Sequence, residues 1–324
     1  MNSFFPYRFV KKDSNIVLVG GGAVGKEFFI QVHETNWCEV IAWVDKAFDA
    51  YELERPFDYF RNVNNYSPDY FVIAEKDISK SAELKEELVS QYGIDEEKIV
   101  WSRCYYNLGE GFFPGDRVHY FKDLPFFMEL LDDYLDLDDF FANNKYYQSY
   151  APLGLKGARV NGERVLLYDI PNLLNKNSNV LDIGCNSGFL SLTVAPLVKS
   201  IIGVDIDERF ISIANKVKNY MKIENAQFKK VDVFSEGLSE KYDAIFMLSL
   251  PSNIGVYEKA DMIVDSLNPG GYLFLESHYM DSNSEAYLYD KLINTYRDKG
   301  LNEVVLHRNA YFDNRDITVL RKID

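Results

Sequence analysis

The stretch Leu181-Asp-Ile-Gly-Cys-Asn-Ser-Gly188 decides the fold of the C-terminal half, because it takes an apolar run into a glycine turn. A helical pattern over residues 189–197 follows the turn directly. Gly184 allows a sharp turn and a close approach of a ligand to the backbone, and Gly188 relieves crowding at the start of the helix. Asp182 lies near the end of the strand, where a carboxylate could anchor a cationic or amine-bearing ligand. The stretch therefore predicts a strand–turn–helix unit that holds a ligand at its turn.

Two further carboxylates follow the next two apolar runs. Asp205 comes seventeen residues after Gly188, within Gly203-Val-Asp-Ile-Asp207. An acidic residue at the tip of the second strand is placed to accept hydrogen bonds from both hydroxyls of a ribose. Asp232 follows the third run, where it could meet an adenine amino group. These positions favour a ligand with a nucleoside part.

The apolar runs of the C-terminal half predict seven strands. Helical segments separate the early strands, and a turn links the last two. The predicted strands cover residues 180–183, 200–204, 227–231, 242–248, 271–276, 303–307 and 316–320. Strands that alternate with helices favour a parallel α/β sheet, and the closing pair favours an antiparallel hairpin at its edge.

Taken together, these motifs resemble the class I S-adenosylmethionine (SAM) dependent methyltransferases over residues 146–324. The resemblance implies a seven-stranded Rossmann-like fold with SAM as the methyl donor. It places Asp182 and Gly184 beside the methionine part of SAM, Asp205 at the ribose and Asp232 at the adenine. The other residues that it assigns to SAM binding are Asn186 and Gly188 in the turn, and Ile206, Val233 and Leu248 through their backbone.

Two finer resemblances point to different acceptors. Asn186 replaces the middle glycine of the commoner Gly-x-Gly-x-Gly turn, and this form is similar to methylphosphate-capping enzymes and tRNA wobble-uridine carboxymethyl transferases. The segment 150–159, continuing to Arg164 and Tyr168, is similar to bacterial sugar and secondary-metabolite methyltransferases instead. The family is therefore better specified than the substrate.

The candidates for acting on the acceptor follow the fourth and fifth predicted strands, where this fold places the acceptor. His278 could serve as a general base near neutral pH, or it could be a polar loop residue. Glu276 could serve as the base or as a hydrogen-bond acceptor behind the site, and Ser249 could contact the substrate. Arg159 and Arg164 could clamp an anionic group or pair with structural carboxylates. We expect Cys185 to be a packing residue rather than a nucleophile.

The N-terminal segment contains a second glycine turn. The run Asn15-Ile-Val-Leu-Val-Gly20 leads into Gly20, Gly22 and Gly25, which fit G-x-G-x-x-G, and Asp45 follows twenty residues after Gly25. This is the dinucleotide-binding pattern in its strand–turn–helix context, and it predicts a smaller Rossmann-like α/β domain. Only about 90 residues are available, and a full dinucleotide domain needs a second half. A nucleotide or nucleotide-sugar site, bound NAD, and a degenerate structural or dimerising module all remain open.

The pattern predicts strands at 38–44, 69–74 and 98–101 and a helix over 77–92 in this first domain. Glycine and proline then mark a linker, and residues 124–141 repeat apolar side chains at helical spacing between aspartates. We expect an amphipathic helix with a solvated acidic face. The predicted divisions are a domain over 1–108, a linker with this helix over 109–145, and the methyltransferase domain over 146–324.

The composition of the 324 residues narrows the class of protein. Hydrophobic residues make up 47%, a globular composition, and the apolar runs are too short to cross a membrane. The three cysteines are far apart and predict neither a disulfide framework nor a metal site. The net charge of −15 disfavours a nucleic-acid partner, which usually requires a basic face. We expect a cytoplasmic protein without a secretion signal. Assembly into a homo-oligomer stays open.

These observations favour methylation of an oxygen atom on a small anionic or sugar-derived acceptor, which includes nucleotide-linked forms. An RNA methyltransferase is the first alternative, and the acidic charge counts against it. A non-catalytic regulator that binds SAM or a nucleotide is the second. An NAD-dependent oxidoreductase is the third, and it rests on the N-terminal glycine turn alone.

Overall fold

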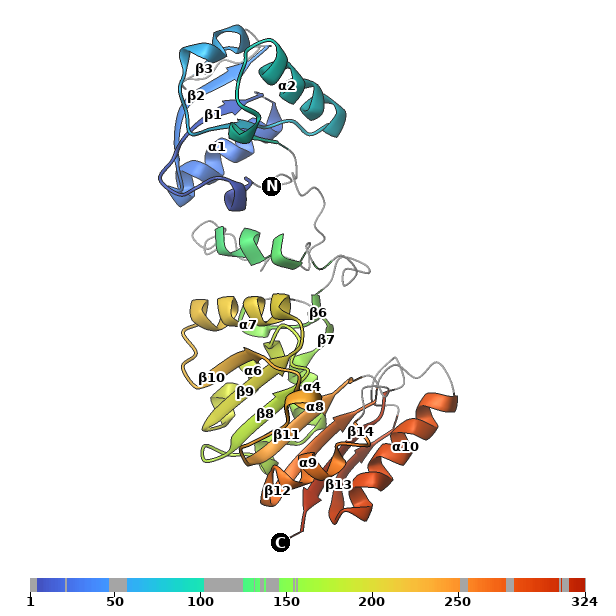
Figure 1. The fold of residues 1–324 in the computed structure, drawn as a ribbon. Coiled ribbons are helices and arrows are strands. Elements are labelled where there is room, and N and C mark those ends of the chain that lie inside the picture. Colours follow the sequence, from blue (N-terminus) through green and yellow to red (C-terminus); the bar gives the residue numbers. More distant parts are fainter. Residues whose placement is uncertain are drawn as a thin grey trace. The chain divides into compact units, whose positions relative to one another are not determined.

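The structure is a computed structural model (Figure 1). It describes residues 5–20, 22–46, 57–101, 125–130, 132–134, 137, 146–153, 155, 157–250, 256–277, 283–308, 310 and 315–323. The chain divides into two compact units, Met1–Asn144 and Lys145–Asp324. Each unit is described by itself.

The N-terminal unit contains a five-stranded parallel sheet in the order β3-β2-β1-β4-β5. Its strands are β1 (Asn15–Val19), β2 (Glu39–Asp45), β3 (Phe57–Tyr59), β4 (Tyr70–Ile73) and β5 (Ile99–Val100). Helices α1 (Ala23–Thr35) and α2 (Ile78–Ser90) connect strands of this sheet, and short 3-10 helices lie at Tyr7–Phe9, Phe60–Asn65 and Glu96–Lys98. The order confirms the smaller Rossmann-like α/β fold expected here.

The core of this sheet follows from its apolar runs. Val17 and Val19 of β1 pack in one cluster with Val44 of β2 and Ile73 of β4. Successive residues of β1 are all buried after Asn15, as expected for a central parallel strand with both faces covered. Strand β3 was missed from the sequence, because three residues are too few to show an alternating pattern.

The C-terminal unit contains a seven-stranded mixed sheet in the order β10-β9-β8-β11-β12-β14-β13. Six strands run in the same direction, whereas β14 runs antiparallel to its neighbours β12 and β13. The strands are β8 (Asn179–Ile183), β9 (Ser200–Asp205), β10 (Ala226–Lys230), β11 (Tyr242–Leu248), β12 (Leu267–Glu276), β13 (Leu301–His307) and β14 (Ile317–Lys322). This arrangement confirms the predicted methyltransferase fold, including the closing antiparallel hairpin.

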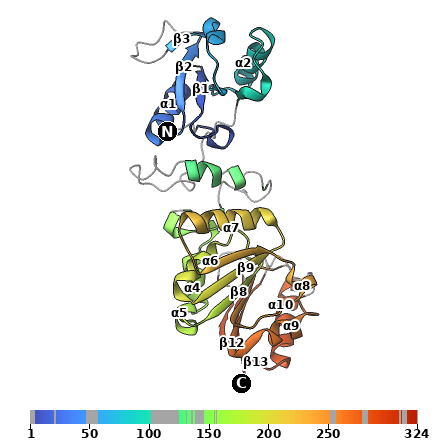
Figure 2. The same cartoon turned by 60° about the vertical axis from the view of Figure 1, so that its left-hand side comes forward.

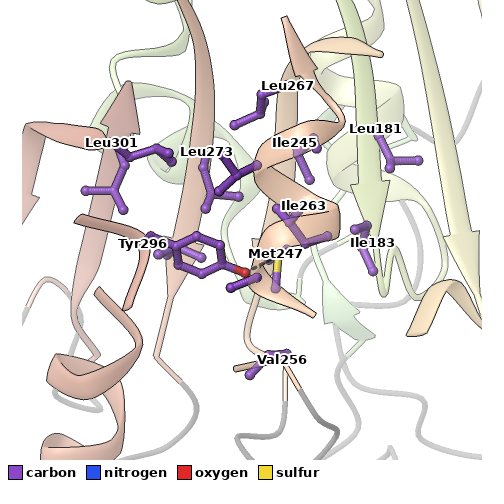
Figure 3. Close-up of a cluster of buried hydrophobic side chains, with 14 of the residues drawn as sticks. Leu181, Ile183, Ile245, Met247, Val256, Ile263, Leu267, Leu273, Tyr296 and Leu301 are labelled. Carbon is purple, nitrogen blue, oxygen red and sulfur yellow. Dashed lines mark hydrogen bonds between the residues drawn. The ribbon is translucent and has the colours of Figure 1, made fainter. Parts of the chain in front are cut away.

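Helices cover both faces of this sheet, with α4, α5 and α6 on one side and α8, α9 and α10 on the other (Figure 2). Their bounds are α4 (Asn161–Leu167), α5 (Ile170–Leu173), α6 (Phe189–Val194), α7 (Glu208–Tyr220), α8 (Val233–Glu236), α9 (Ala260–Asp265) and α10 (Asn283–Asp298); 3-10 helices lie at Ala151–Leu153 and Ala195–Leu197. One core cluster joins Leu181, Ile245 and Leu273 of adjacent strands to Tyr296 of α10, whose hydroxyl lies 3.7 Å from the sulfur of Met247 (Figure 3). This packing holds in place the carboxyl ends of the strands that carry the candidate site residues.

Two short strands precede the large sheet, β6 (Tyr146–Gln148) and β7 (Gly157–Arg159). They form a separate parallel pair with Gln148 opposite Arg159. The sequence did not predict them, since each has three residues and the pairing joins segments that no periodicity links. Strand β6 matters because its side chains reach the predicted SAM turn.

The predicted helix over 124–141 is described only in part. Residues 125–130 and 132–134 are helical, and Phe127, Met128 and Leu130 are buried. Asp132 is buried as well, so the expectation of a solvated acidic face is wrong for this residue. Asp136, Asp138 and Asp139 lie outside the described residues. Among the described helices, none is both long and apolar enough to cross a membrane.

Candidate functional site

The turn between β8 and α6 has the backbone form that the sequence suggested. Gly184, Asn186 and Gly188 adopt φ angles of 72°, 53° and 70°. The amides of Gly184 and Cys185 both donate to the carbonyl of Val204 on β9, at 2.8 and 3.0 Å. A Cβ atom on Gly188 would lie 2.5 Å from the ring of Phe228, so a side chain there would force the helix away from the sheet. The turn is thereby held against the end of β9.

Asp205 is the last residue of β9, and its side chain contacts the glycine turn. Its carboxylate accepts hydrogen bonds from the amides of Asn186 at 2.9 Å and Asp207 at 3.0 Å. Burial raises the pKa of Asp205, and these backbone hydrogen bonds offset part of that effect. Each carboxylate oxygen can accept more than one hydrogen bond, so acceptor capacity is left for ligand hydroxyls.

Asp182 of β8 is buried, with 3% of its surface exposed. It accepts a hydrogen bond from the hydroxyl of Ser191 on α6. Burial raises the pKa of Asp182 to about 6, even though Ser191 and the charge of Arg164 act in the opposite direction. A buried carboxylate of this kind is stabilised by a cationic ligand, such as the ammonium group of an amino acid.

Ile206, Asp232, Val233 and Leu248 occupy the neighbouring strand ends. Ile206 exposes 69% of its surface immediately after Asp205, which leaves an apolar face next to the carboxylate. Asp232 caps α8 and accepts from the Ser235 hydroxyl at 2.6 Å; this hydrogen bond lowers the pKa of Asp232. Val233 and Leu248 are buried. Binding of SAM by these residues, and by Asp182 and Asp205, stays a prediction.

A cluster of buried polar side chains lies at the carboxyl ends of β11 and β12. Its centre is Glu276, the last residue of β12, whose side chain is fully buried. Glu276 accepts from Arg164 Nη2 at 2.9 Å, from the Tyr168 hydroxyl at 2.8 Å, and from the hydroxyl of Ser249. Arg315 Nη1 lies 3.4 Å from the same carboxylate and donates to Ser249 Oγ at 2.6 Å. We call these five residues the arginine–glutamate cluster.

The charge state of this cluster follows from its contacts. Burial raises the pKa of Glu276, but Arg164 and the hydrogen bonds from Ser249 and Tyr168, together with Arg315, outweigh burial and hold the pKa below its usual range. Glu276 is therefore ionised, with donors on both carboxylate oxygens. Arg164 pairs with it, which is the structural pairing considered for this arginine from the sequence.

Tyr147 of β6 reaches the same cluster and is only half-buried. Its phenol hydrogen-bonds to Ser249 and lies within the fields of Arg164, Arg315 and Glu276. Burial alone would raise the pKa of Tyr147, but the two guanidinium groups and the Ser249 hydrogen bond lower it below its usual value.

The adjacent Gln148 contacts the glycine turn directly. Its side chain donates to the carbonyl of Cys185 at 3.2 Å and accepts from the amide of Leu190 at 3.0 Å. Strand β6 therefore joins the turn to the arginine–glutamate cluster. Cys185 itself is buried, and burial followed by the charges of Asp182 and Asp205 raises the pKa of its thiol. That environment suits packing rather than nucleophilic attack, as expected.

Comparison with known proteins assigns a family to this part of the chain. Residues 174–307 match a family model described as a methyltransferase domain. Residues 174–307 form a class I SAM-dependent methyltransferase domain. The match covers the strands that carry Asp182, Asp205 and Glu276.

Two curated relatives show similarity to this methyltransferase domain. The U6 snRNA methylphosphate capping enzyme Amus of Drosophila melanogaster is 34% identical over 131 residues, which are 33% of this chain and 44% of that protein. A tRNA U34 carboxymethyltransferase of Nautilia profundicola is 28% identical over 138 residues, which are 39% of this chain and 44% of that protein. The chain thus spans less than half the length of these relatives.

One solved structure is also similar. The N-methyltransferase NodS of Bradyrhizobium japonicum, in complex with S-adenosyl-L-homocysteine, aligns with a TM-score of 0.43 at 20% identity. The alignment covers 59% of this chain and 99% of NodS.

The remaining sequence candidates for acting on the acceptor are His278 and Arg159. His278 lies outside the described residues, so its role as a base stays a prediction. Arg159 is buried in β7, and its role as an anion clamp also stays a prediction. Arg315 and Tyr147 were missed. Arg315 had no motif to mark it, and Tyr147 stands among the many tyrosines of the chain; only contacts across the fold distinguish the two.

The N-terminal glycine turn has a compact structure. The indole of Trp43 on β2 donates to the carbonyl of Gly20 at 2.7 Å, and a Cβ atom on Gly25 would lie 2.5 Å from the same ring. Gly25 therefore permits close packing of α1 on the sheet. Gly22 stands at the start of α1, and Asp45 ends β2. Nucleotide binding by these residues stays a prediction.

Two surface hollows lie away from both glycine turns. One, of about 640 Å³, is lined by Asn15 and Glu39 at the amino ends of β1 and β2. The other, of about 290 Å³, is lined by Asp243 and Tyr272 of β11 and β12, at the end of the sheet opposite Glu276. Neither is where parallel α/β sheets bind their ligands, so the site is assigned from the strand ends instead.

Proposed function

We propose that this protein transfers a methyl group from SAM to an oxygen atom of a small acceptor that is anionic or sugar-derived, including nucleotide-linked forms. The observation that carries the proposal is the arginine–glutamate cluster at the carboxyl ends of β11 and β12. These strands belong to the methyltransferase domain, and ligands of such sheets bind at the carboxyl ends of the strands.

The charge of the cluster supports this acceptor class. Arg164 and Arg315 bring two positive charges to a buried place, and Glu276 brings one negative charge. Guanidinium groups in a poorly solvated site stabilise an acceptor that carries negative charge or develops it on the attacking oxygen.

Each residue of the site would have a separate role. SAM, when bound, supplies a methyl group on a sulfonium, which is an activated leaving group. Asp205 would hold the ribose hydroxyls, and Asp182 would hold the ammonium of the methionine part. Glu276 would be a positioning residue, because an ionised carboxylate with donors on both oxygens orients Arg164 and Arg315 rather than takes up a proton.

RNA methylation is the second candidate function. The printed names of two relatives, a U6 snRNA capping enzyme and a tRNA carboxymethyltransferase, favour it. The net charge of −15 counts against it, since binding of a phosphate backbone draws most of its affinity from basic groups.

One experiment separates these candidates. The full chain is incubated with SAM labelled in the methyl group and with three separate pools: sugar nucleotides, small hydroxylated acids, and total RNA. The proposal expects label in one of the small-molecule pools and none in RNA. Label in RNA alone would replace the first candidate with the second. Binding of SAM without labelling of any pool would refute both, in favour of a regulator.

A further inference from the structure

We propose that Gln148 is a positioning residue that holds the turn between β8 and α6 in the form that binds SAM. This inference rests on the proposed function, because that turn is expected to hold the methionine part of SAM. The geometry that points to it is a pair of hydrogen bonds from one side chain to both ends of the turn. Gln148 Nε2 donates to the carbonyl of Cys185 at 3.2 Å, and its Oε1 accepts from the amide of Leu190 at 3.0 Å.

The first step concerns the start of α6. The first amides of a helix have no carbonyl partner inside the helix, and the side chain of the residue before the helix usually accepts from one of them. In α6 that residue is Gly188, which has no side chain. A Cβ atom there would lie 2.5 Å from the ring of Phe228, so no capping side chain fits. Gln148 supplies the missing acceptor to Leu190 from another part of the chain.

The second step concerns the other end of the turn. The amide of Gly188 donates to the carbonyl of Cys185 at 3.0 Å and closes the turn around Asn186. Asn186 adopts a φ angle of 53°, a left-handed form that costs free energy for any residue with a side chain. Such a form persists where the surrounding contacts hold it. The contacts here are the hydrogen bond from the Asn186 amide to Asp205 and the hydrogen bond from Gln148 to Cys185.

The third step concerns the choice of side chain. An amide carries both a donor and an acceptor at its end, so it can satisfy the carbonyl of Cys185 and the amide of Leu190 together. A thioether side chain of the same length would form neither hydrogen bond. Gln148 is only 4% exposed, so both backbone groups lie where water does not readily replace the lost partner.

The backbone of β6 is held in place behind this side chain. Gln148 lies opposite Arg159 of β7, and the amide of Ser149 donates to the carbonyl of Arg159 at 2.7 Å. Asn161 at the start of α4 donates to the carbonyl of Ser149 at 2.7 Å. A Cβ atom on Gly157 of β7 would lie 2.3 Å from the carbonyl carbon of Gln148, so this close approach of the two strands requires glycine. These contacts fix the point from which Gln148 reaches the turn.

The effect on SAM follows from this arrangement. A turn that already has its binding form loses little conformational entropy when the ligand arrives. Without Gln148, the turn would populate other forms, and the affinity would fall by the fraction of molecules that keep the binding form. Gln148 therefore acts on SAM through the turn.

The first test measures the affinity of the full-length protein for S-adenosyl-L-homocysteine by calorimetry. Gln148→Met keeps the size of the side chain and removes both hydrogen bonds. Affinity should fall roughly 5- to 100-fold, the range for leaving buried polar groups without partners. Gln31→Met is the matched control, because Gln31 is also buried and accepts from the amide of Phe5 at 2.9 Å, but it lies in the N-terminal unit. The control should bind as the wild type does. Wild-type affinity in folded Gln148→Met would overturn the inference.

A second variant decides the matter if Gln148→Met does not fold. Gly157→Ala leaves the Gln148 side chain intact but displaces the backbone of β6, so it should also lower the affinity. Gly162→Ala is its matched control, since a Cβ atom on Gly162 meets nothing within 4 Å. Wild-type affinity in Gly157→Ala, or an equal loss in Gly162→Ala, would then overturn the inference.

Amide hydrogen exchange separates positioning of the turn from a general loss of stability. In the wild type, the Leu190 amide should exchange slowly with and without S-adenosyl-L-homocysteine. In Gln148→Met it should exchange faster in the free protein and slowly again when the ligand is bound, while the amides of β8 and β11 exchange as in the wild type. Faster exchange over the whole domain, with no particular effect at Leu190, would show a merely structural role and overturn the inference.

These measurements use no acceptor, so failure of the proposed function is recognised separately. In that case the labelling experiment yields no labelled pool, although the wild type binds S-adenosyl-L-homocysteine and Gln148→Met binds it less tightly. Where an acceptor is labelled, Gln148→Met should raise the KM for SAM and leave kcat at saturating SAM close to the wild-type value. A lower kcat with an unchanged KM would overturn the inference, because Gln148 would then act on methyl transfer and not on the turn.

Discussion

Replacing Glu276 by glutamine tests whether this carboxylate holds the arginine–glutamate cluster together. The change keeps the size of the side chain but removes its charge, and it leaves Arg164 and Arg315 buried without their carboxylate. Breaking a buried ion pair by removal of one partner costs about 3–5 kcal/mol, because the remaining charge is still desolvated. We expect a loss of stability of this size in Glu276→Gln.

The assay is urea unfolding of the full-length protein, followed by a probe of the methyltransferase domain. With a denaturant dependence of roughly 2 kcal/mol per molar urea, a loss of 3–5 kcal/mol lowers the midpoint by about 1.5–2.5 M. Glu303→Gln is the matched control. It makes the same chemical change in a surface pair with Arg297, where the two side chains are 27% and 44% exposed. That pair should contribute no more than about 1 kcal/mol.

The pH dependence of the same protein gives an independent check. The pKa of Glu276 is lowered in the folded protein, so the folded state holds its proton less tightly than the unfolded state. The stabilisation is therefore present above the unfolded pKa and is lost as the pH falls towards the folded one. Equal urea midpoints for the two variants, or an acid-induced loss of stability that Glu276→Gln leaves unchanged, would refute the reasoning.

Three further predictions concern SAM binding. Asp205→Ala should lower the affinity for SAM about tenfold or more, as measured by calorimetry, because charge-assisted hydrogen bonds to the ribose are lost together with the hydrogen bond that holds the Asn186 amide. Unchanged affinity in a folded variant would argue against the assignment of Asp205 to the ribose. SAM should bind less tightly as the pH falls below about 6, where Asp182 becomes protonated, and Asp182→Asn should remove this dependence. A chain that begins at Lys145 should still bind SAM, since that unit contains all seven strands of the large sheet; a folded fragment without affinity would show that the N-terminal unit contributes to the site.

The residues expected to bind SAM could be singled out from the sequence because they are local. Asp182, Gly184 and Gly188 lie within one strand–turn–helix unit, and Asp205 follows at a distance along the chain that one helix and one strand determine. A central parallel strand is buried on both faces, so its residues form an apolar run that can be recognised without knowing its neighbours. The seven strands and the closing hairpin followed from the same signal.

The residues proposed to face the acceptor are brought together only by the tertiary structure. Arg164 and Glu276 are 112 residues apart, and Arg315 lies another 39 residues beyond Glu276. No periodicity links such positions. The sequence therefore left Arg164 open as an anion clamp or a structural partner of a carboxylate, and Glu276 as a base or a hydrogen-bond acceptor, and it gave no reason to single out Arg315 or Tyr147. Strand order brings these side chains to one end of the sheet, and burial away from water then makes their charges interdependent. The lowered pKa of Glu276, and with it the role proposed for this residue, arises only in the folded chain.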